Sequence, residues 1–314
     1  MSLQLRLLRG LLWLGRRRLQ AKGLPSAAAL RAWSERVAAR QPGWPPQVRV
    51  RQLNAAGVPC YWVEPAGADP EAAIVYLHGG CYCLGSVAST HRGFIWRLAE
   101  AAGCRLLGVE YRLAPEHAFP AALEDSLAAW KWLLETAGAA PGRVALAGDS
   151  AGGGLVYATL VALRDAGGPL PAVALAVSPW ADLTVSGATI ASNDRRDPIL
   201  YDALLRQTAG WYLAGHDPMD PRASPVYADW RGLPPSLLLA GSSEVLLDDA
   251  RRLATGLADA GIAVALRAWP EVPHAWPVLR PALAESRAAI SLCGRFLAAH
   301  LTSGRRQPCG ASSA

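Results

Sequence analysis

The chain has 314 residues, 52% of them hydrophobic and 18% charged, which is enough to bury the core of one large α/β domain with an appendage. None of its apolar runs reaches the roughly 18 residues that a membrane span needs. Residues 1–52 hold eleven basic side chains and one acidic one, whereas the remaining residues hold twenty basic and twenty-four acidic ones. Because the body of the chain is net acidic, the composition excludes a basic nucleic-acid-binding surface across the fold.

Residues 1–47 form an N-terminal arm that ends in the proline-rich QPGWPP. Apolar side chains recur in it at helical spacing, with arginines on the opposite side: Leu3, Leu7, Leu11 and Leu14 against Arg6, Arg9, Arg16 and Arg17. This pattern predicts an amphipathic basic helix, which suits a lid, a membrane-surface helix or an export signal. The export signal is the least favoured of the three, because Arg9, Gly10 and Arg16 to Arg18 interrupt the apolar run that it needs.

Short apolar runs alternate with longer helical patterns from residue 48 onward. Strands are predicted over 48–53, 58–63, 72–77, 105–110, 143–147, 172–178, 236–240 and 263–268, and helices over 89–102, 121–137, 151–166, 247–260 and 281–300. The first two strands are expected to form a hairpin, and the later alternation predicts a mostly parallel sheet with helices on both faces. Residues 181–230 interrupt the alternation, and with the arm they are expected to form a cap over the strand ends.

The six cysteines form no C-x-x-C pair and no dense disulfide framework. We therefore expect buried or free thiols in a reducing compartment, which favours a cytoplasmic location. No metal site is predicted. A polar tail over residues 302–314 is expected to be disordered.

The stretch VALAGDSAGGG at 144–154 places a serine directly after a predicted strand and among small residues. A strand followed by G-x-S-x-G favours a sharp turn into a helix, with Ser150 displayed at the apex. The alternative is that Ser150 only caps the next helix, so the remaining motifs have to decide between the two.

A serine nucleophile needs a base, and the base needs an acid that orients it. His274 follows the last predicted strand and comes after Ser150, in the order that such sheets require. The acid is expected after the preceding strand, where Glu244, Asp248 and Asp249 are available. Glu244 lies in the turn and is preferred, because the two aspartates open a helix, where acids are favoured regardless of catalysis. Asp248 is the substitute.

Amide donors for an oxyanion are expected after an earlier strand. The stretch YLHGGCYCLGS places His78, Gly79 and Gly80 directly after that strand, where glycines let backbone N–H groups approach a negatively charged oxygen. The amide of Ala151, just past Ser150, is expected to be the third donor beside those of Gly79 and Gly80.

Several motifs occur in one order over about residues 48–300: HGGCYCLGS, YRLAPEHAFPAALED, GDSAGGG, SPWADLT and VPHAW. With them the chain resembles the bacterial hormone-sensitive-lipase-type esterases, a family of α/β-hydrolases. The resemblance assigns the nucleophile, acid and base to Ser150, Glu244 and His274. Two positions depart from the family pattern: Cys81 stands where a third glycine is usual, and Glu-Val-Leu stands where the acid turn is usually Asp-Pro-Leu.

The resemblance implies an eight-stranded, mostly parallel sheet flanked by helices, and no cofactor. The catalytic domain is expected to comprise residues 48–180 and 231–301. Residues 1–47 and the insertion 181–230 are expected to form a helical cap, with the leucine face of the arm docked over the mouth of the active site. In the YRLAPEH segment, an ion pair between Glu110 and Arg112 is expected to brace the loop.

The expected function is a serine carboxylesterase that hydrolyses small, short-acyl esters. Trp180, Trp211 and Trp276 are expected to narrow the acyl pocket, although they suit packing of cap against core equally well. Relatives with the same triad open lactones or remove acetyl groups from small metabolites, and the sequence does not separate these. Peripheral membrane contact through the arm and a homodimer are both left open.

The alternative from another class is a ligand-binding module. Plant gibberellin receptors resemble this fold but have lost the histidine. His274 is present, which favours an enzyme.

Overall fold

The computed structural model describes residues 2–302, so the tail predicted over residues 302–314 lies outside the described residues except for its first residue. Eight strands form one mostly parallel sheet, as expected, and their order in the sheet is β1-β2-β4-β3-β5-β6-β7-β8. They are β1 (Val48–Ala55), β2 (Val58–Pro65), β3 (Asp69–Leu77), β4 (Cys104–Val109), β5 (Val144–Asp149), β6 (Val173–Val177), β7 (Ser236–Gly241) and β8 (Val264–Trp269). Strand β2 pairs antiparallel with β1 and β4, and β3 to β8 run parallel.

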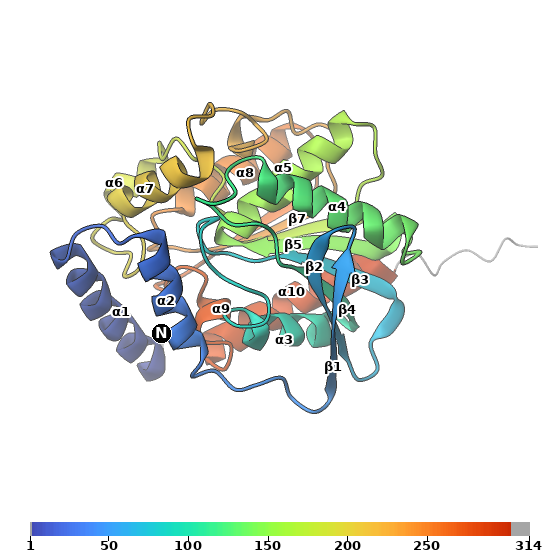
Figure 1. The fold of residues 1–314 in the computed structure, drawn as a ribbon, viewed down its shortest axis with the longest axis horizontal. Helices are drawn as coiled ribbons and strands as arrows, with labels where there is room; N and C mark the ends of the chain where they lie inside the picture. Colours follow the sequence, from blue (N-terminus) through green and yellow to red (C-terminus); the bar gives the residue numbers. More distant parts are fainter. Residues whose placement is uncertain (1, 303–314) are drawn as a thin grey trace, which may run out of the picture.

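Helices cover both faces of this sheet (Figure 1). One face packs against α3 (Arg92–Ala102), α9 (Trp276–Leu279) and α10 (Ala284–Thr302), and the other against α4 (Ala121–Glu135), α5 (Ser150–Asp165) and α8 (Leu247–Asp259). Two-sided cover explains why β5 and β6 read as continuous apolar runs rather than alternating ones, since every residue in them is buried. A short 3-10 turn, η1 (Pro141–Arg143), precedes β5.

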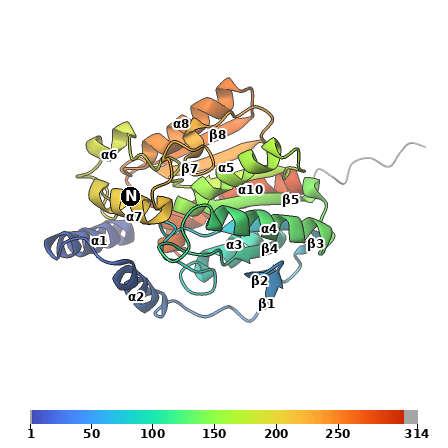
Figure 2. The ribbon, with the colours of Figure 1, turned by 45° about the horizontal axis from the view of Figure 1, so that its top comes forward.

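The arm and the insertion lie together at one end of the molecule, at the left in both Figure 1 and Figure 2. The arm contains α1 (Leu3–Ala21) and α2 (Ala27–Ala38), and the insertion contains α6 (Ala188–Ser192), α7 (Asp202–Leu213) and the 3-10 turn η2 (Pro225–Tyr227). Arg16 of α1 joins the two, because its guanidinium donates to the carbonyl oxygens of Asp194, Asp197 and Leu200.

The face of α1 that docks is not the one expected from the sequence. Leu5 and Arg16 are buried, whereas the regularly spaced leucines are exposed: Leu3 by 71%, Leu7 by 62%, Leu11 by 66% and Leu14 by 54%. The expectation that the leucine face covers the active site is therefore wrong. The inner face is partly polar because the insertion presents main-chain carbonyls, which need hydrogen-bond donors when they are buried.

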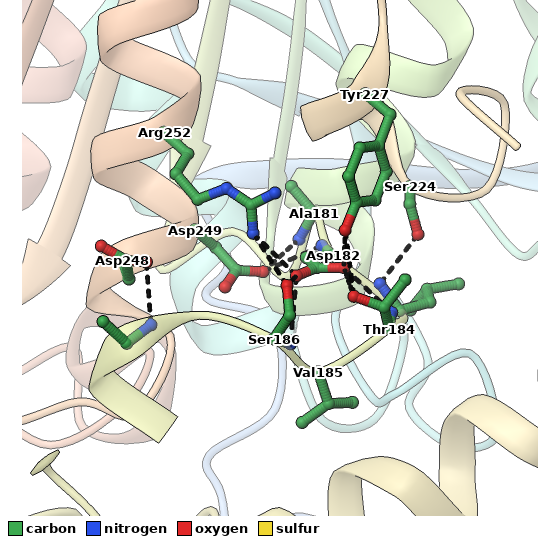
Figure 3. Close-up of polar contacts among 12 residues, drawn as sticks. Ala181, Asp182, Thr184, Val185, Ser186, Ser224, Tyr227, Asp248, Asp249 and Arg252 are labelled. Atoms are coloured by element: carbon green, nitrogen blue, oxygen red, sulfur yellow. Dashed lines mark hydrogen bonds and ion pairs between the residues drawn. The ribbon is translucent and has the colours of Figure 1, made fainter. Parts of the chain in front are cut away.

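The insertion is anchored to α8 by two buried carboxylates near its start (Figure 3). Asp182 accepts hydrogen bonds from the backbone and side chain of Ser186 and forms an ion pair with Arg252 at 2.7 Å. Asp249 accepts from the amides of Ala181 and Asp182, both at 2.9 Å, and burial raises its pKa to about 8. The SPWADLT motif therefore fixes the point where the insertion leaves the sheet.

The brace expected in the YRLAPEH segment has different partners. Arg112 forms ion pairs with Asp125 at 2.8 Å and Glu124 at 2.9 Å, both on α4. Glu110 instead accepts a hydrogen bond from Ser86 Oγ at 2.7 Å. The expected pair between Glu110 and Arg112 is thus replaced by separate contacts, in which Arg112 binds α4 and Glu110 binds the loop after β3.

Candidate active site

Ser150 lies at the junction of β5 and α5. Its φ of +54° places its backbone in the left-handed region, which residues other than glycine rarely adopt. The turn closes because its neighbours lack side chains. A Cβ on Gly148 would lie 2.5 Å from the Gly152 carbonyl oxygen, and one on Gly152 would lie 2.0 Å from the Leu77 carbonyl oxygen. The small residues of the G-x-S-x-G motif are therefore required for the sharp turn that displays the hydroxyl.

His274 lies in the turn after β8 and reaches this hydroxyl. Its Nε2 is 2.8 Å from Ser150 Oγ, and both side chains are buried, with 7% and 5% of their surface exposed. Burial lowers the pKa of His274, but the hydrogen bond and charge of Glu244 and the charge of Asp197 raise it, so that the net pKa lies above 6.5. A base in hydrogen-bond contact with a hydroxyl is the arrangement that activates a serine.

Glu244 completes the chain of contacts. Its Oε2 is 2.8 Å from His274 Nδ1, and its Oε1 accepts hydrogen bonds from Ser178 Oγ at 2.8 Å and from the Gly241 amide. Asp248, the substitute acid, accepts from the Ala188 amide at 2.9 Å instead. The structure thus brings together Ser150, His274 and Glu244, the three residues preferred from the sequence. Asp248 instead binds the main chain of the insertion.

Ser178 is a site residue that sequence reasoning missed. Its hydroxyl donates to Glu244 Oε1 and accepts from the amide of Ala275, beside the candidate base, at 3.1 Å. Ser178 follows β6 and has a φ of +50°. The signal that could have found it is its position, since it stands at the carboxyl end of a parallel strand, where sites in such sheets gather.

The loop after β3 differs from the expectation at one residue. The Gly79 amide, expected to be an oxyanion donor, donates to Asp149 Oδ1 at 3.0 Å and lies 3.2 Å from His91 Nε2. The prediction for Gly79 is therefore corrected. The amides of Gly80 and Cys81 follow it in the loop, and the amide of Ala151 opens α5, whose N-terminal dipole favours negative charge beside Ser150.

A buried polar cluster behind Ser150 sets the path of this loop. Asp149 accepts a hydrogen bond from the Tyr76 hydroxyl at 2.5 Å and pairs with His91 at 3.2 Å, besides binding the Gly79 amide. Burial lowers the pKa of His91, but the charge and hydrogen bond of Asp149 raise it, with a net pKa above 6.5. The carboxylate of Asp149, the residue before Ser150, therefore holds the loop after β3 through the main-chain amide of Gly79.

Comparisons with known proteins agree with this geometry. A family model described as the alpha/beta hydrolase fold matches residues 74–278. A solved structure described as an esterase from the bacterial hormone-sensitive lipase (HSL) family has a TM-score of 0.90 and 41% sequence identity, and covers 96% of this chain and 99% of that chain. The chain belongs to the hormone-sensitive-lipase-type esterases of the α/β-hydrolase family.

Curated relatives of this esterase-family chain carry related names. An acetyl-hydrolase of Streptomyces hygroscopicus is 51% identical over 236 residues, which cover 75% of this chain and 78% of that protein. An ethyl acetate hydrolase of Pseudomonas putida is 34% identical over 259 residues, with 78% and 79% covered.

The three tryptophans expected near the acyl pocket of this esterase-family chain lie in different surroundings. Trp180 is fully buried with its ring centroid 6.1 Å from that of Tyr82, and Trp211 is partly buried on α7. Trp276 is also fully buried, but it lies in the core on the other face of the sheet, with its ring centroid 5.4 Å from that of Trp269. The pocket expectation for Trp276 is therefore corrected to a packing role.

The turn that carries Glu244 is held by the cap segments from outside the sheet. Asn193 Nδ2 donates to the Glu244 carbonyl oxygen at 2.8 Å, and the Val245 amide donates to Asp197 Oδ2 at 3.0 Å. From α1, Arg9 donates to Ser243 Oγ at 2.9 Å and to the Glu271 carbonyl oxygen at 2.6 Å. The arm and insertion thus fix the acid turn and the loop that leads to His274.

Proposed function

We propose that this protein is a serine carboxylesterase that hydrolyses small, short-acyl esters through an acyl-enzyme intermediate. The observation that carries the proposal is the continuous hydrogen-bond chain from Ser150 through His274 to Glu244, with 2.8 Å at each step. Nucleophile, base and orienting acid in this relation form the arrangement through which a serine carries out acyl transfer.

The reaction follows from the positions of these atoms. Ser150 Oγ attacks the ester carbonyl while His274 Nε2 accepts its proton, and Glu244 stabilises the imidazolium that forms. The amides of Ala151, Gly80 and Cys81 are the proposed donors to the oxyanion, each contributing about 3 kcal/mol when it binds the transition state. His274 then protonates the leaving alcohol, and a water activated by the same base releases the acid.

The names of the relatives bear on the substrate class. Acetyl-hydrolase and ethyl acetate hydrolase both describe removal of the smallest common acyl group. This supports small esters as substrates, and it keeps deacetylation of a small metabolite as an alternative with the same triad. Lactone opening needs no further residue and is the other alternative. A ligand-binding module is disfavoured, because His274 is hydrogen-bonded to both of its catalytic partners.

The function is tested by supplying esters, lactones and acetylated metabolites in parallel and by mass spectrometry after treatment with a small fluorophosphonate. We expect a single covalent adduct on Ser150 and the highest kcat/KM on short esters. Highest activity on a lactone or on an acetylated metabolite would move the assignment to that alternative. No adduct and no turnover of any substrate would support the binding module.

The pH dependence of the reaction is expected to follow His274. Only the neutral imidazole accepts the Ser150 proton, so kcat/KM for p-nitrophenyl acetate should be lost as the pH falls through the pKa of His274. Because that pKa is raised, the midpoint of the acid limb is expected above 6.5. Steady-state rates between about pH 5 and pH 9 measure it. An acid limb centred below 6.5 would contradict the role of Glu244 and Asp197 in raising this pKa.

The acyl-chain preference is expected to be short, about C2 to C6, because pocket shape sets specificity. Trp180 and Trp211 are the proposed walls. Comparison of p-nitrophenyl acetate, butyrate, hexanoate and palmitate should show kcat/KM at least about 10-fold lower for palmitate than for butyrate. Equal rates on butyrate and palmitate would remove the narrow pocket from the proposal.

Location and assembly stay predictions. Within residues 2–302, no helix combines the length and apolar character that crossing a membrane requires. The five cysteines in this part of the chain are free and buried. A cytoplasmic location, a homodimer and a peripheral contact between the arm and a membrane are all compatible with the proposed reaction.

A further inference from the structure

The outer face of α1 exposes an apolar stripe that no other part of the described chain covers. We call it the leucine stripe, and it consists of Leu3, Leu7, Leu11 and Leu14, which are each more than half exposed. The spacing of these residues places them along one side of the helix. Both views place α1 at the outer edge of the molecule (Figure 1, Figure 2). Four exposed leucines in line on a surface helix indicate an interaction site.

The position of the stripe is fixed by the opposite face of the same helix. Arg16 binds three carbonyl groups of the insertion and forms an ion pair with Asp194 at 2.8 Å. Arg9 binds the loops after β7 and β8, and its ion pair with Glu271 is 3.2 Å long. With its polar anchors turned inward, α1 does not need to rotate to present the leucines to a partner.

Exposed positive charge lies beside the stripe, and it includes Arg6 and Arg17, which the sequence pattern had placed on the opposite side of the helix. Arg6, Arg17, Arg18 and Lys22 are exposed on α1 and at its end. Among residues 2–302 these four side chains have no acidic partner, and α1 itself contains no acidic residue. Exposed leucines bordered by unpaired cationic side chains match the two parts of an anionic bilayer surface, the acyl boundary and the headgroups.

We propose that α1 docks the protein on an anionic lipid bilayer through the leucine stripe, with Arg6, Arg17 and Arg18 contacting the headgroups. The helix would lie in the plane of the surface. Because an α-helix with its side chains is about 10 Å thick, the bilayer would then lie roughly one helix away from the loops that carry Glu244 and His274. Esters that partition into the membrane surface would thus be concentrated beside the proposed active site.

A second copy of the chain fits this face less well. One side of a 19-residue helix offers about 28 Å by about 10 Å, or roughly 300 Å², whereas a stable interface buries about 800 Å² on each partner. Symmetric pairing through the stripe would also bring the flanking arginines of the two copies together, and like charges oppose association. A fluid anionic surface has neither restriction.

The test is co-sedimentation of the full-length protein with vesicles of two compositions. One is phosphatidylcholine alone, and the other contains about one part phosphatidylglycerol to three parts phosphatidylcholine. We expect the partition coefficient to be at least about 10-fold higher on the anionic vesicles. Binding should weaken in about 0.5 M NaCl but persist in part, because salt screens the arginines and not the leucines.

Two surface variants separate the apolar contribution from the charged one. Leu7→Gln combined with Leu11→Gln should lower the partition coefficient about 10-fold on the anionic vesicles, and Arg17→Gln combined with Arg18→Gln should remove most of the preference for them. Met219→Gln, which replaces an exposed apolar side chain elsewhere, should bind as the wild type does. Hydrolysis of p-nitrophenyl acetate without vesicles should be unchanged in all variants and reports that they are folded.

Three outcomes would overturn the proposal. The first is no binding of the wild type to the anionic vesicles, and the second is wild-type binding by the double leucine variant. The third is a wild-type dimer in analytical ultracentrifugation that becomes a monomer in the leucine variant, without vesicle binding by either, which would assign the stripe to a second copy. Vesicle binding needs no turnover, so this test and that of the esterase reaction fail independently.

Discussion

Replacing Ser150 with alanine is expected to lower kcat/KM for p-nitrophenyl acetate by at least about 10⁴-fold while the fold is kept. The substitution removes Ser150 Oγ, which lies 2.8 Å from His274 Nε2. The proposed base then has no nucleophile to activate. Alanine also has a smaller side chain than serine, and the turn around Gly148 and Gly152 already accommodates a Cβ at this position. Steady-state kinetics and the midpoint of thermal unfolding measure the two parts of the prediction.

Ser126→Ala is the matched control, because it removes another buried hydroxyl that contacts Thr159 Oγ1 at 2.7 Å, outside the site. It should keep ester hydrolysis near the wild-type rate even if it lowers stability. Activity of Ser150→Ala within about 10-fold of the wild type would exclude Ser150 as the nucleophile. In that case another hydroxyl or a directly activated water would have to carry the reaction.

The sheet and the three central site residues could be predicted because each has a local signal. The strands of the sheet appear as short apolar runs, because a parallel strand that is buried on both faces consists mostly of consecutive apolar residues. Ser150, Glu244 and His274 each follow such a run. Since the carboxyl ends of parallel strands meet at one edge, their order along the chain was sufficient to place them near one another.

The role of Gly79 could not be predicted because it depends on a main-chain contact. The glycines of this loop indicate that backbone amides can approach an oxyanion. They do not indicate which of these amides already donates to another group of the protein. Here the carboxylate of Asp149, next to Ser150, accepts a hydrogen bond from the Gly79 amide. The same limit applies to Asn193 and Asp197, which bind main-chain groups of the acid turn from a segment about 50 residues earlier in the sequence.

The orientation of α1 shows a limit of amphipathic patterns. The period of the leucines predicts a helix with an apolar side and a basic side, and hydrophobicity alone favours burial of the apolar side. In the structure Arg9 and Arg16 outweigh this preference, because three carbonyl oxygens within the insertion and one in the loop after β8 need donors. These hydrogen bonds join the arm to segments that are distant in the sequence, so the sequence of the arm alone does not indicate them.

Replacing Glu244 with glutamine is expected to lower kcat/KM by about 10³- to 10⁴-fold, whereas Asp248→Asn should lower it by less than about 3-fold. Glu244 contacts His274 Nδ1 at 2.8 Å, and a neutral amide there neither stabilises the imidazolium nor fixes the ring tautomer. Asp248 accepts from the Ala188 amide, and an asparagine oxygen can accept the same hydrogen bond. Steady-state rates on p-nitrophenyl acetate for both variants measure the difference.

Glu244→Asp is the informative companion to these two variants, because it keeps the charge and shortens the side chain by one methylene. The turn is clamped at the main chain by Asn193 and Asp197, so the shorter carboxylate cannot simply move toward His274. We therefore expect a loss of about 10-fold or more, intermediate between the wild type and Glu244→Gln. If Asp248→Asn instead loses more activity than Glu244→Gln, Asp248 is the acid, and the 2.8 Å contact of Glu244 with His274 does not serve the reaction.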